Sequence, residues 1–337
     1  MRKRFVAMVF IVFLCVFSVL FPVGACDDVG QTLTVRVDGA GNYTSIQEAI
    51  DAATSKDTIY VSPGIYHETI VVNKTITLLG EEKNTTMIDS SNSGFYAVLI
   101  QAQDVTLSGF TIQNSTVGIY VAGNKSVSNT TITNNVITNN KDGIYLDNIS
   151  NVVIFGNVIT ANDGNGIRLY GSIDNNIYEN TISGHQSYGI VLWDSSYNNI
   201  ISRNIITDNK NGVGLRRWSD NNVVSENNVS QNRNSGILLG YSFYNNLTGN
   251  NITDNSNGIS IGDASENFIS ANYIAYNYRG IYLYDATGNI IDEDNVFLGN
   301  DEDISEGSKT FKIPGFELVL IICAMLFVLL CKRKISI

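Results

Sequence analysis

Side chains that could bind an acidic sugar recur at equivalent positions of a repeated sequence. In each repeat a Gly opens an alternating apolar run, and the residues two and four places after this Gly are expected to face outward. These positions include Tyr145, Asp147, Arg168, Tyr170, Trp193 and Arg216, and Asp194, Arg217 and Trp218 adjoin them. Aromatic faces stack on sugar rings, and Arg donates paired hydrogen bonds to a carboxylate. The pattern predicts a binding surface for an acidic saccharide, with an ordinary exposed strand face as the alternative.

A catalytic interpretation requires a carboxylate cluster or a paired acid and base. Asp147, Asp194 and Arg216 could supply parts of such a site, and His185 could supply a base. However, His185 stands where other repeats have an Asn, and a substituted repeat position is more often structural. A polysaccharide lyase, epimerase or hydrolase therefore stays an alternative, with Ca²⁺ as the cofactor if the protein were a lyase.

The elements that must position these side chains are the short strands of the repeat. The Gly that opens the apolar run recurs every 22 to 25 residues, at Gly118, Gly143, Gly166, Gly189, Gly212, Gly236, Gly258 and Gly280. Apolar residues alternate after each Gly, which indicates a strand with one buried face, and no helical periodicity separates the runs. Three short strands fit in each unit. Units that cannot bury an apolar face alone must stack on one another, so the sequence predicts a solenoid.

Asparagine marks the bends between the predicted strands. One Asn recurs at Asn135, Asn157, Asn180, Asn204, Asn227, Asn250, Asn272 and Asn295, and a second at Asn140, Asn162, Asn209, Asn232, Asn255, Asn277 and Asn300. Asn tolerates the left-handed backbone conformation of tight bends, and stacked amides can hydrogen-bond to one another. We therefore expect structural ladders here rather than ligand sites.

Over residues 33–305 the repeats resemble the right-handed parallel β-helix of the NosD-type and pectate-lyase-like superfamily. The resemblance implies an all-β fold with three strands in each coil, an N-terminal module at 33–109 and regular repeats at 110–305. It leaves the function open, because this fold hosts lyases, hydrolases, epimerases, adhesins and metal-insertion accessories. A NosD-like metal-insertion accessory is thus another alternative.

Copper, the metal that such an accessory would handle, selects imidazole or sulfur ligands. Outside the terminal segments the chain offers Met87, His67 and His185, with Cys26 at the boundary, and these lie far apart in the order of the coils. We predict no metal site and no other cofactor.

The N-terminal module contains an amphipathic segment that predicts a capping helix. Ile46, Ala49, Ile50 and Ala53 fall on one helical face, and Thr44 with Gln47 has the spacing of a capping box. Strands are expected at 58–62, 69–72 and 75–79. This module resembles the start of pectin methylesterases, but the catalytic motifs of that family have no match in the chain. His67 is therefore expected to be a turn or surface residue.

The ends of the chain predict export and retention at the cell surface. Residues 1–25 have the basic start, apolar run and small residues of a signal peptide, with an uncleaved anchor as the alternative. A linker at 306–313 is followed by residues 314–337, which resemble the PGF-type sorting signal of archaeal surface proteins. The resemblance rests on Pro314, Gly315 and Phe316 and on a terminal basic triplet. The apolar run from Leu318 to Cys331 is about 21 Å long as a helix, shorter than a bilayer core.

Charge and glycosylation motifs agree with an extracellular location. The net charge of -11 disfavours nucleic acid as a partner, because phosphate binding needs clustered Lys and Arg. Glycosylation sequons begin at Asn42, Asn73, Asn84, Asn114, Asn124, Asn129, Asn148, Asn228, Asn246 and Asn251. The leading hypothesis is a surface-anchored β-helix protein with a structural or glycan-binding role, whose partners are a cell-envelope glycan or surface-layer components and, through the C-terminal segment, the membrane.

Overall fold

The computed structural model describes residues 30–91, 94–122 and 127–307. The predicted signal peptide, Cys26 and the sorting segment with Pro314, Gly315 and Phe316 lie outside the described residues. No helix in the described part of the chain is both long and apolar enough to cross a bilayer.

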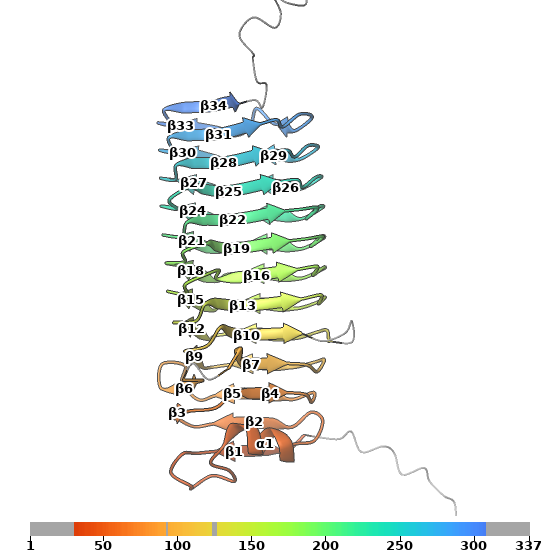
Figure 1. Cartoon of the computed structure of the whole chain (residues 1–337), viewed down its shortest axis with the longest axis vertical. Helices are drawn as coiled ribbons and strands as arrows, with labels where there is room; N and C mark the ends of the chain where they lie inside the picture. Colours follow the sequence, from red (N-terminus) through yellow and green to blue (C-terminus); the bar gives the residue numbers. More distant parts are fainter. Residues whose placement is uncertain (1–29, 92–93, 123–126, 308–337) are drawn as a thin grey trace, which may run out of the picture.

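Each turn of the chain adds one strand to each of three parallel sheets, which we call sheets A, B and C (Figure 1). The predicted right-handed parallel β-helix is thus confirmed. Sheet A consists of β1 (Thr32–Val35), β2 (Thr58–Val61), β5 (Thr77–Gly80), β8 (Thr106–Ser108), β11 (Thr131–Thr133), β14 (Val153–Phe155), β17 (Asn176–Tyr178), β20 (Ile200–Ser202), β23 (Val223–Ser225), β26 (Asn246–Thr248), β29 (Phe268–Ser270) and β32 (Ile290–Ile291).

From β8 onward, each strand of sheet A is followed after a short bend by a strand of sheet B. Sheet B consists of β3 (Gly64–Tyr66), β6 (Thr86–Asp89), β9 (Thr111–Gln113), β12 (Val136–Thr138), β15 (Val158–Thr160), β18 (Thr181–Ser183), β21 (Ile205–Thr207), β24 (Asn228–Ser230), β27 (Asn251–Thr253), β30 (Tyr273–Ala275) and β33 (Val296–Leu298).

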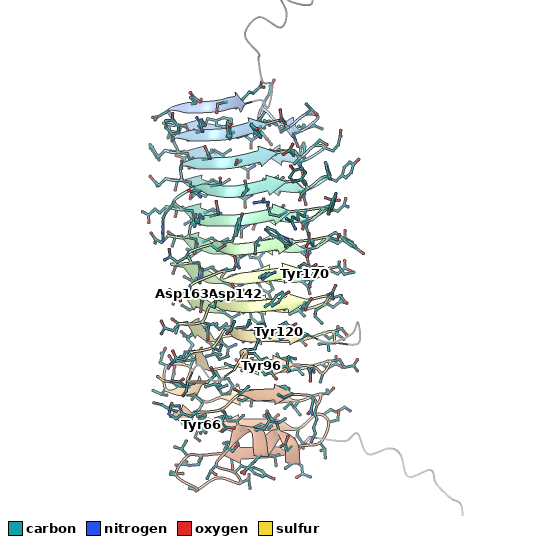
Figure 2. All side chains as sticks on the ribbon, in the orientation of Figure 1. Tyr66, Tyr96, Tyr120, Asp142, Asp163 and Tyr170 are labelled. Carbon is teal, nitrogen blue, oxygen red and sulfur yellow. The ribbon has the colours of Figure 1, made fainter. Side chains whose placement is uncertain are left out.

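Sheet C contains the strands that begin at or near the repeated Gly, and most of them are longer than those of the other sheets. It consists of β4 (Ile70–Val72), β7 (Tyr96–Ile100), β10 (Val117–Ala122), β13 (Asp142–Asp147), β16 (Ile167–Tyr170), β19 (Tyr188–Trp193), β22 (Asn211–Arg216), β25 (Ser235–Gly240), β28 (Asn257–Gly262), β31 (Arg279–Tyr284) and β34 (Glu302–Gly307). Tyr96, Tyr120 and Tyr170 lie on strands of this sheet (Figure 2).

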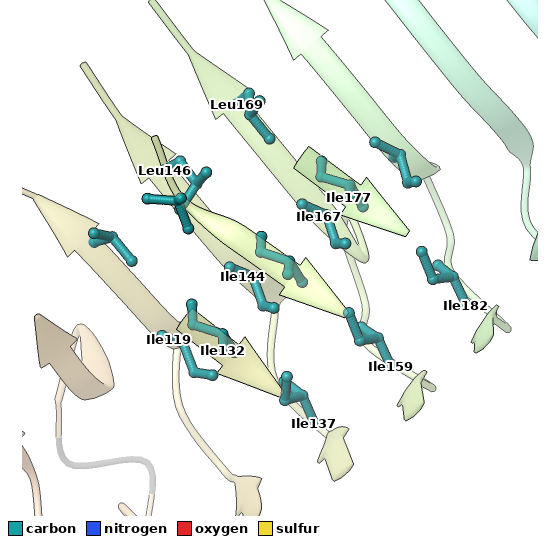
Figure 3. Packing of buried hydrophobic residues seen from close by; sticks show 14 of the residues in the cluster. Ile119, Ile132, Ile137, Ile144, Leu146, Ile159, Ile167, Leu169, Ile177 and Ile182 are labelled. Carbon is teal, nitrogen blue, oxygen red and sulfur yellow. The ribbon is translucent and has the colours of Figure 1, made fainter. Parts of the chain in front are cut away.

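The interior is filled by stacked aliphatic side chains from all three sheets. In one coil Ile132, Ile137 and Ile144 point inward, and each lies beside its equivalent in the next coil (Figure 3). All three are fully buried. The repeated Gly is required by this packing, because a Cβ on Gly166 would lie 2.5 Å from the carbonyl oxygen of Gly189 in the next coil. The alternating apolar pattern therefore specifies both the strands and their stacking.

Buried asparagines join successive coils at the bends. Asn204, for example, accepts hydrogen bonds on Oδ1 from the backbone N and the Nδ2 of Asn180, both at 3.0 Å. Its own Nδ2 donates to Ile177 O at 2.9 Å and to Asn227 Oδ1 at 3.0 Å. Equivalent bonds recur along both series named from the sequence, with His185 in place of an Asn between Asn162 and Asn209. A third series, not named from the sequence, precedes sheet A at Asn175, Asn199, Asn222, Asn245, Asn267 and Asn289.

The N-terminal end of the solenoid is covered by α1 (Ile46–Ala52), which buries Ile46, Ala49 and Ile50. The predicted capping box is wrong in detail, because Ser45 rather than Thr44 is the N-cap. The carboxylate of Glu68 accepts hydrogen bonds from the backbone N of Ile46 and Gln47, both at 3.0 Å, and Ser45 Oγ accepts one from Glu48 N, so these side chains satisfy free donors of the first turn. Helix α1 lies beside β1 and β2 at the lower end of the solenoid in Figure 1.

Asn204→Ala should destabilise the protein by roughly 2 to 4 kcal/mol, because it removes the acceptor of the buried backbone N–H of Asn180 and the hydrogen bonds to Asn180 Nδ2 and Ile177 O. Chemical denaturation of the variant measures this loss. Asn228→Ala is the matched control, since Asn228 is an exposed Asn on sheet B and its loss should change stability by less than about 0.5 kcal/mol. Equal effects of the two substitutions would contradict a stabilising role for the ladder.

Candidate functional site

The outer face of sheet C brings six of the nine predicted binding residues into two adjacent columns. Tyr145 and Arg168 are register partners in one column. The other column contains Asp147, Tyr170, Trp193 and Arg216 in successive coils. Three coil steps of about 4.8 Å separate its two ends by roughly 14 Å. The remaining three residues, Asp194, Arg217 and Trp218, lie in the bends that follow β19 and β22.

Trp193 anchors two arginines at the centre of this face. The guanidinium carbons of Arg216 and Arg217 lie 5.4 and 5.0 Å from the centre of the Trp193 ring, within the range of cation–π attraction. Arg217 also lies 3.9 Å from Oδ1 of Asp194, and Trp218 next to it is 60% exposed. The arrangement places two cations and an exposed aromatic ring on one side of the solenoid.

Two outward-facing glycines allow Arg216 to lie along the sheet. A Cβ on Gly214 would come within 2.6 Å of the Tyr188 ring, and a Cβ on Gly240 within 2.9 Å of Arg216 Nε. The guanidinium donates a hydrogen bond of 2.8 Å from Nη1 to the hydroxyl of Tyr188. Sequence analysis missed Tyr188, although the outward Gly in the neighbouring coil was a signal that a large side chain lies across it.

A second cation–aromatic pair lies in the two coils before that of Trp193, with Arg168 one coil away and Tyr145 two. The guanidinium of Arg168 is 4.7 Å from the centre of the Tyr145 ring and 4.0 Å from Oδ2 of Asp142. Asp142, only 8% exposed, accepts hydrogen bonds from the backbone N and the Nδ2 of Asn165 at 2.7 and 2.9 Å. Sequence analysis also missed Asp142, which precedes the repeated Gly of its coil and helps to hold Arg168.

Both oxygens of Asp147 are engaged by neighbouring side chains. The Tyr120 hydroxyl donates to Oδ2 and the Asn148 amide donates to Oδ1, each at 2.8 Å. Tyr120 also stacks on Tyr145, with ring centres 5.2 Å apart. Burial, together with the hydrogen bond to Asp147, raises the pKa of Tyr120, so this phenol stays a neutral donor. Asp147 therefore orders the aromatic column rather than presenting a free carboxylate.

His185 lies away from this face, in the asparagine series between sheets B and C. The side chain is 0% exposed, and Nε2 lies 3.2 Å from the carbonyl oxygen of Ile159. Burial lowers the pKa of the imidazole, and hydrogen bonds to the carbonyls of Asn162 and Ile159 oppose this shift. The structure thus places His185 in the ladder that its position predicts.

The weak catalytic candidates do not form an acid–base pair. Asp147 and Arg216 are three coils apart, Asp194 pairs with Arg217, and His185 is buried. A general base must lie within hydrogen-bond reach of the proton that it removes, either directly or through one water. These four residues do not meet that requirement with one another in the structure.

A solenoid of parallel strands joined by buried asparagine ladders defines a right-handed parallel β-helix protein. The sequence model of the family described as periplasmic copper-binding protein (NosD) matches residues 50–223 and 195–315. The chain therefore belongs to this NosD family, as the repeats predict.

Shorter similarities link the chain to surface and pectin-related proteins. It is 34% identical over 94 residues to a cell surface glycoprotein of Methanothermus fervidus, which covers 27% of this chain and 16% of the relative. It is 39% identical over 67 residues to a pectinesterase of Petunia integrifolia, which covers 18% of each protein. The chain thus matches less than a fifth of the length of either relative.

Solved structures share the fold at low sequence identity. The A-module of mannuronan C-5 epimerase AlgE6 from Azotobacter vinelandii superposes with a TM-score of 0.62 at 16% identity, covering 78% of this chain and 91% of the module. The Dettilon tailspike protein gives a TM-score of 0.57 at 17% identity, covering 72% of this chain and 62% of the tailspike. At this identity the comparison supports the architecture alone.

The described residues do not fit the copper site that the family description implies. They contain no group of three or more His, Cys, Asp or Glu side chains that could hold a metal ion. His67 is exposed, with Nδ1 3.1 Å from Ser91 Oγ, whereas His185 is buried several coils away. Within the described chain, the imidazoles that copper prefers do not come together.

His185→Asn should reduce the acid sensitivity of the fold. The lowered pKa of the buried imidazole means that the unfolded chain takes up a proton first as the pH falls below about 6.5, so wild-type stability decreases there. The variant restores the ladder residue and removes this proton uptake. Denaturation at a series of pH values tests this, with His67→Asn at the exposed histidine as the matched control. An acid transition that is unchanged in the His185 variant would contradict this account.

Proposed function

We propose that this NosD-family protein is a cell-surface β-helix protein that binds an acidic glycan on the outer face of sheet C. The observation that carries the proposal is the pair of arginines held against Trp193. Held cations can donate charge-assisted hydrogen bonds to sugar carboxylates with little loss of side-chain freedom on binding. The exposed ring of Trp218 beside them can stack on a sugar ring.

The wider face supports the same class of ligand. The Arg168–Tyr145 pair repeats the combination of cation and aromatic ring one to two coils away. None of the sequon asparagines lies in a described strand of sheet C, although Asn148 directly follows β13, whereas Asn228 and Asn251 project from sheet B and Asn246 lies on sheet A. Attached glycans on those sheets would leave the strands of sheet C accessible.

Three features support the proposed location at the cell surface. The similar relative from Methanothermus fervidus is named a cell surface glycoprotein. The sequence predicts a signal peptide at 1–25 and a C-terminal sorting segment at 314–337. A cell-envelope glycan or a surface-layer component is accordingly the partner that we propose.

Two other functions receive less support. A lyase, epimerase or hydrolase would need an acid and a base in reach of one bond, and the candidate residues on sheet C are dispersed. A metal-insertion accessory would need clustered copper donors, which the described residues do not provide.

Trp193→Ala should abolish binding of the acidic glycan, because it releases both arginines from their aromatic support. The fold should persist, since the side chain faces outward. Ile190→Ala in the same strand should instead destabilise the protein by about 2 to 5 kcal/mol through lost burial and a cavity. A glycan array combined with thermal denaturation separates the two effects.

The matched control for Trp193→Ala is Tyr178→Ala on sheet A. Tyr178 is also an outward aromatic residue with an arginine, Arg203, 5.6 Å from its ring. The control should bind the glycan like the wild type. An array without any acidic ligand for the wild-type protein, or equal binding by the Trp193 variant, would overturn the proposed function and leave a structural role at the surface.

Deleting residues 314–337 should release the protein from cells into the medium, because this segment is the proposed anchor. Immunoblotting of cell and medium fractions measures the distribution. Retention of the shortened protein on the cells would place the anchor elsewhere, with Cys26 as the next candidate to test.

A further inference from the structure

A third cation–aromatic group lies near the C-terminal end of the same face. The guanidinium carbon of Arg279 is 4.8 Å from the centre of the Tyr282 ring and 5.0 Å from that of Tyr278. Its Nε lies 3.5 Å from Oε2 of Glu302, which makes an ion pair but not a hydrogen bond. The group therefore combines a held arginine, aromatic rings and one acidic neighbour, as Arg168 does with Tyr145 and Asp142.

The strand register places Tyr282 of this group in the same column as Tyr145 and Arg168, beside the column of Trp193. Tyr284 belongs to the same column as Trp193, with Arg216, Gly240 and Gly262 between them. Four coil steps of about 4.8 Å make this separation roughly 19 Å along the solenoid axis. An extended polymer that follows the axis would meet both groups on one face.

Between the Trp193 site and the Arg279 group, the outward residues of sheet C are uncharged and most of them are small. The outward residues of β25 and β28 are Ser235, Leu238, Gly240, Asn257, Ser260 and Gly262. A Cβ on Gly262 would meet only Tyr284 O, at 3.8 Å, so no side chain covers the sheet at that point. None of these outward positions on β25 and β28 carries a charge.

Strand β34, the last of sheet C in the described chain, sets the C-terminal limit of such a binding path. Beyond Arg279, β34 carries the acidic side chains of Glu302, Asp303 and Glu306. These charges would repel a polyanion, so Arg279 is the final cation of the row. The path thus runs from the Arg168–Tyr145 pair to Arg279, about six coil steps or roughly 29 Å.

We propose that Arg279, Tyr278 and Tyr282 form a second subsite for acidic sugars, so that sheet C binds one extended polyanionic glycan along the solenoid axis. This inference rests on the proposed function of the Trp193 site. A sugar unit is about as long as one coil step, so a short oligomer occupies the central site alone while a longer one also reaches Arg279. Affinity should therefore increase with chain length, because the second contact becomes intramolecular.

The test measures binding of oligogalacturonates, a trisaccharide and an octasaccharide, to the full chain by calorimetry. Wild-type protein should bind the octasaccharide at least tenfold more tightly than the trisaccharide. Arg279→Gln should weaken octasaccharide binding roughly tenfold, the loss expected for one charge-assisted contact, and leave the trisaccharide unchanged. Glu302→Gln should strengthen octasaccharide binding severalfold, because it removes the acidic competitor for Arg279.

Arg203→Gln on sheet A is the matched control. Arg203 also lies over a tyrosine, Tyr178, and pairs with a carboxylate, Glu179 Oε1 at 3.1 Å, but on a different face. This variant should bind both oligomers like the wild type. Thermal denaturation shows whether Arg279→Gln disturbs the last coils, and the Glu302 variant gives a gain of affinity that misfolding cannot produce.

The outcomes distinguish the two proposals. Wild-type protein that binds neither oligomer would overturn the proposed function together with the second subsite. Equal affinity for the two lengths, or octasaccharide binding that is unaffected by both Arg279→Gln and Glu302→Gln, would overturn the second subsite alone.

Discussion

The buried asparagine ladders are the interaction on which the rest of the molecule depends. Each amide both donates to and accepts from the neighbouring coils, as at Asn204, so every bend has the same conformation and the coils cannot slip in register. Buried amides are costly without partners, which makes any other register unfavourable. The isoleucine stacks then fill an interior whose dimensions the bends have already fixed.

Because the register is fixed, residues at the same position of successive repeats lie next to one another and form a column on the surface. Residues that are 22 to 24 positions apart in the sequence, such as Tyr170, Trp193 and Arg216, become neighbours on sheet C. The outward positions are free to vary because the interior does not depend on them. Stability therefore resides in the ladders and the core, while binding specificity resides in the outward columns, and the two can change independently.

The sequence predicted the solenoid because its period, its Gly positions and its alternating apolar residues all reflect packing that repeats in every coil. It also identified six residues of the sheet C face from strand alternation alone. It missed Asp142 and Tyr188, whose roles depend on contacts with Arg168 and Arg216 from other coils. The predicted N-cap of α1 was wrong because it too depends on a distant contact. Glu68, from a later part of the chain, binds the first backbone N–H groups of the helix.

The central claim is that a register fixed by buried amides presents sheet C as one continuous axial surface for an acidic glycan. A crystal structure of the protein with a bound acidic oligosaccharide tests it most directly. We predict that the sugar chain lies parallel to the solenoid axis over sheet C, with carboxylates within hydrogen-bond distance of Arg216 and Arg279. A chain that crosses the coils at right angles, or that binds over sheet A or sheet B, would contradict the account.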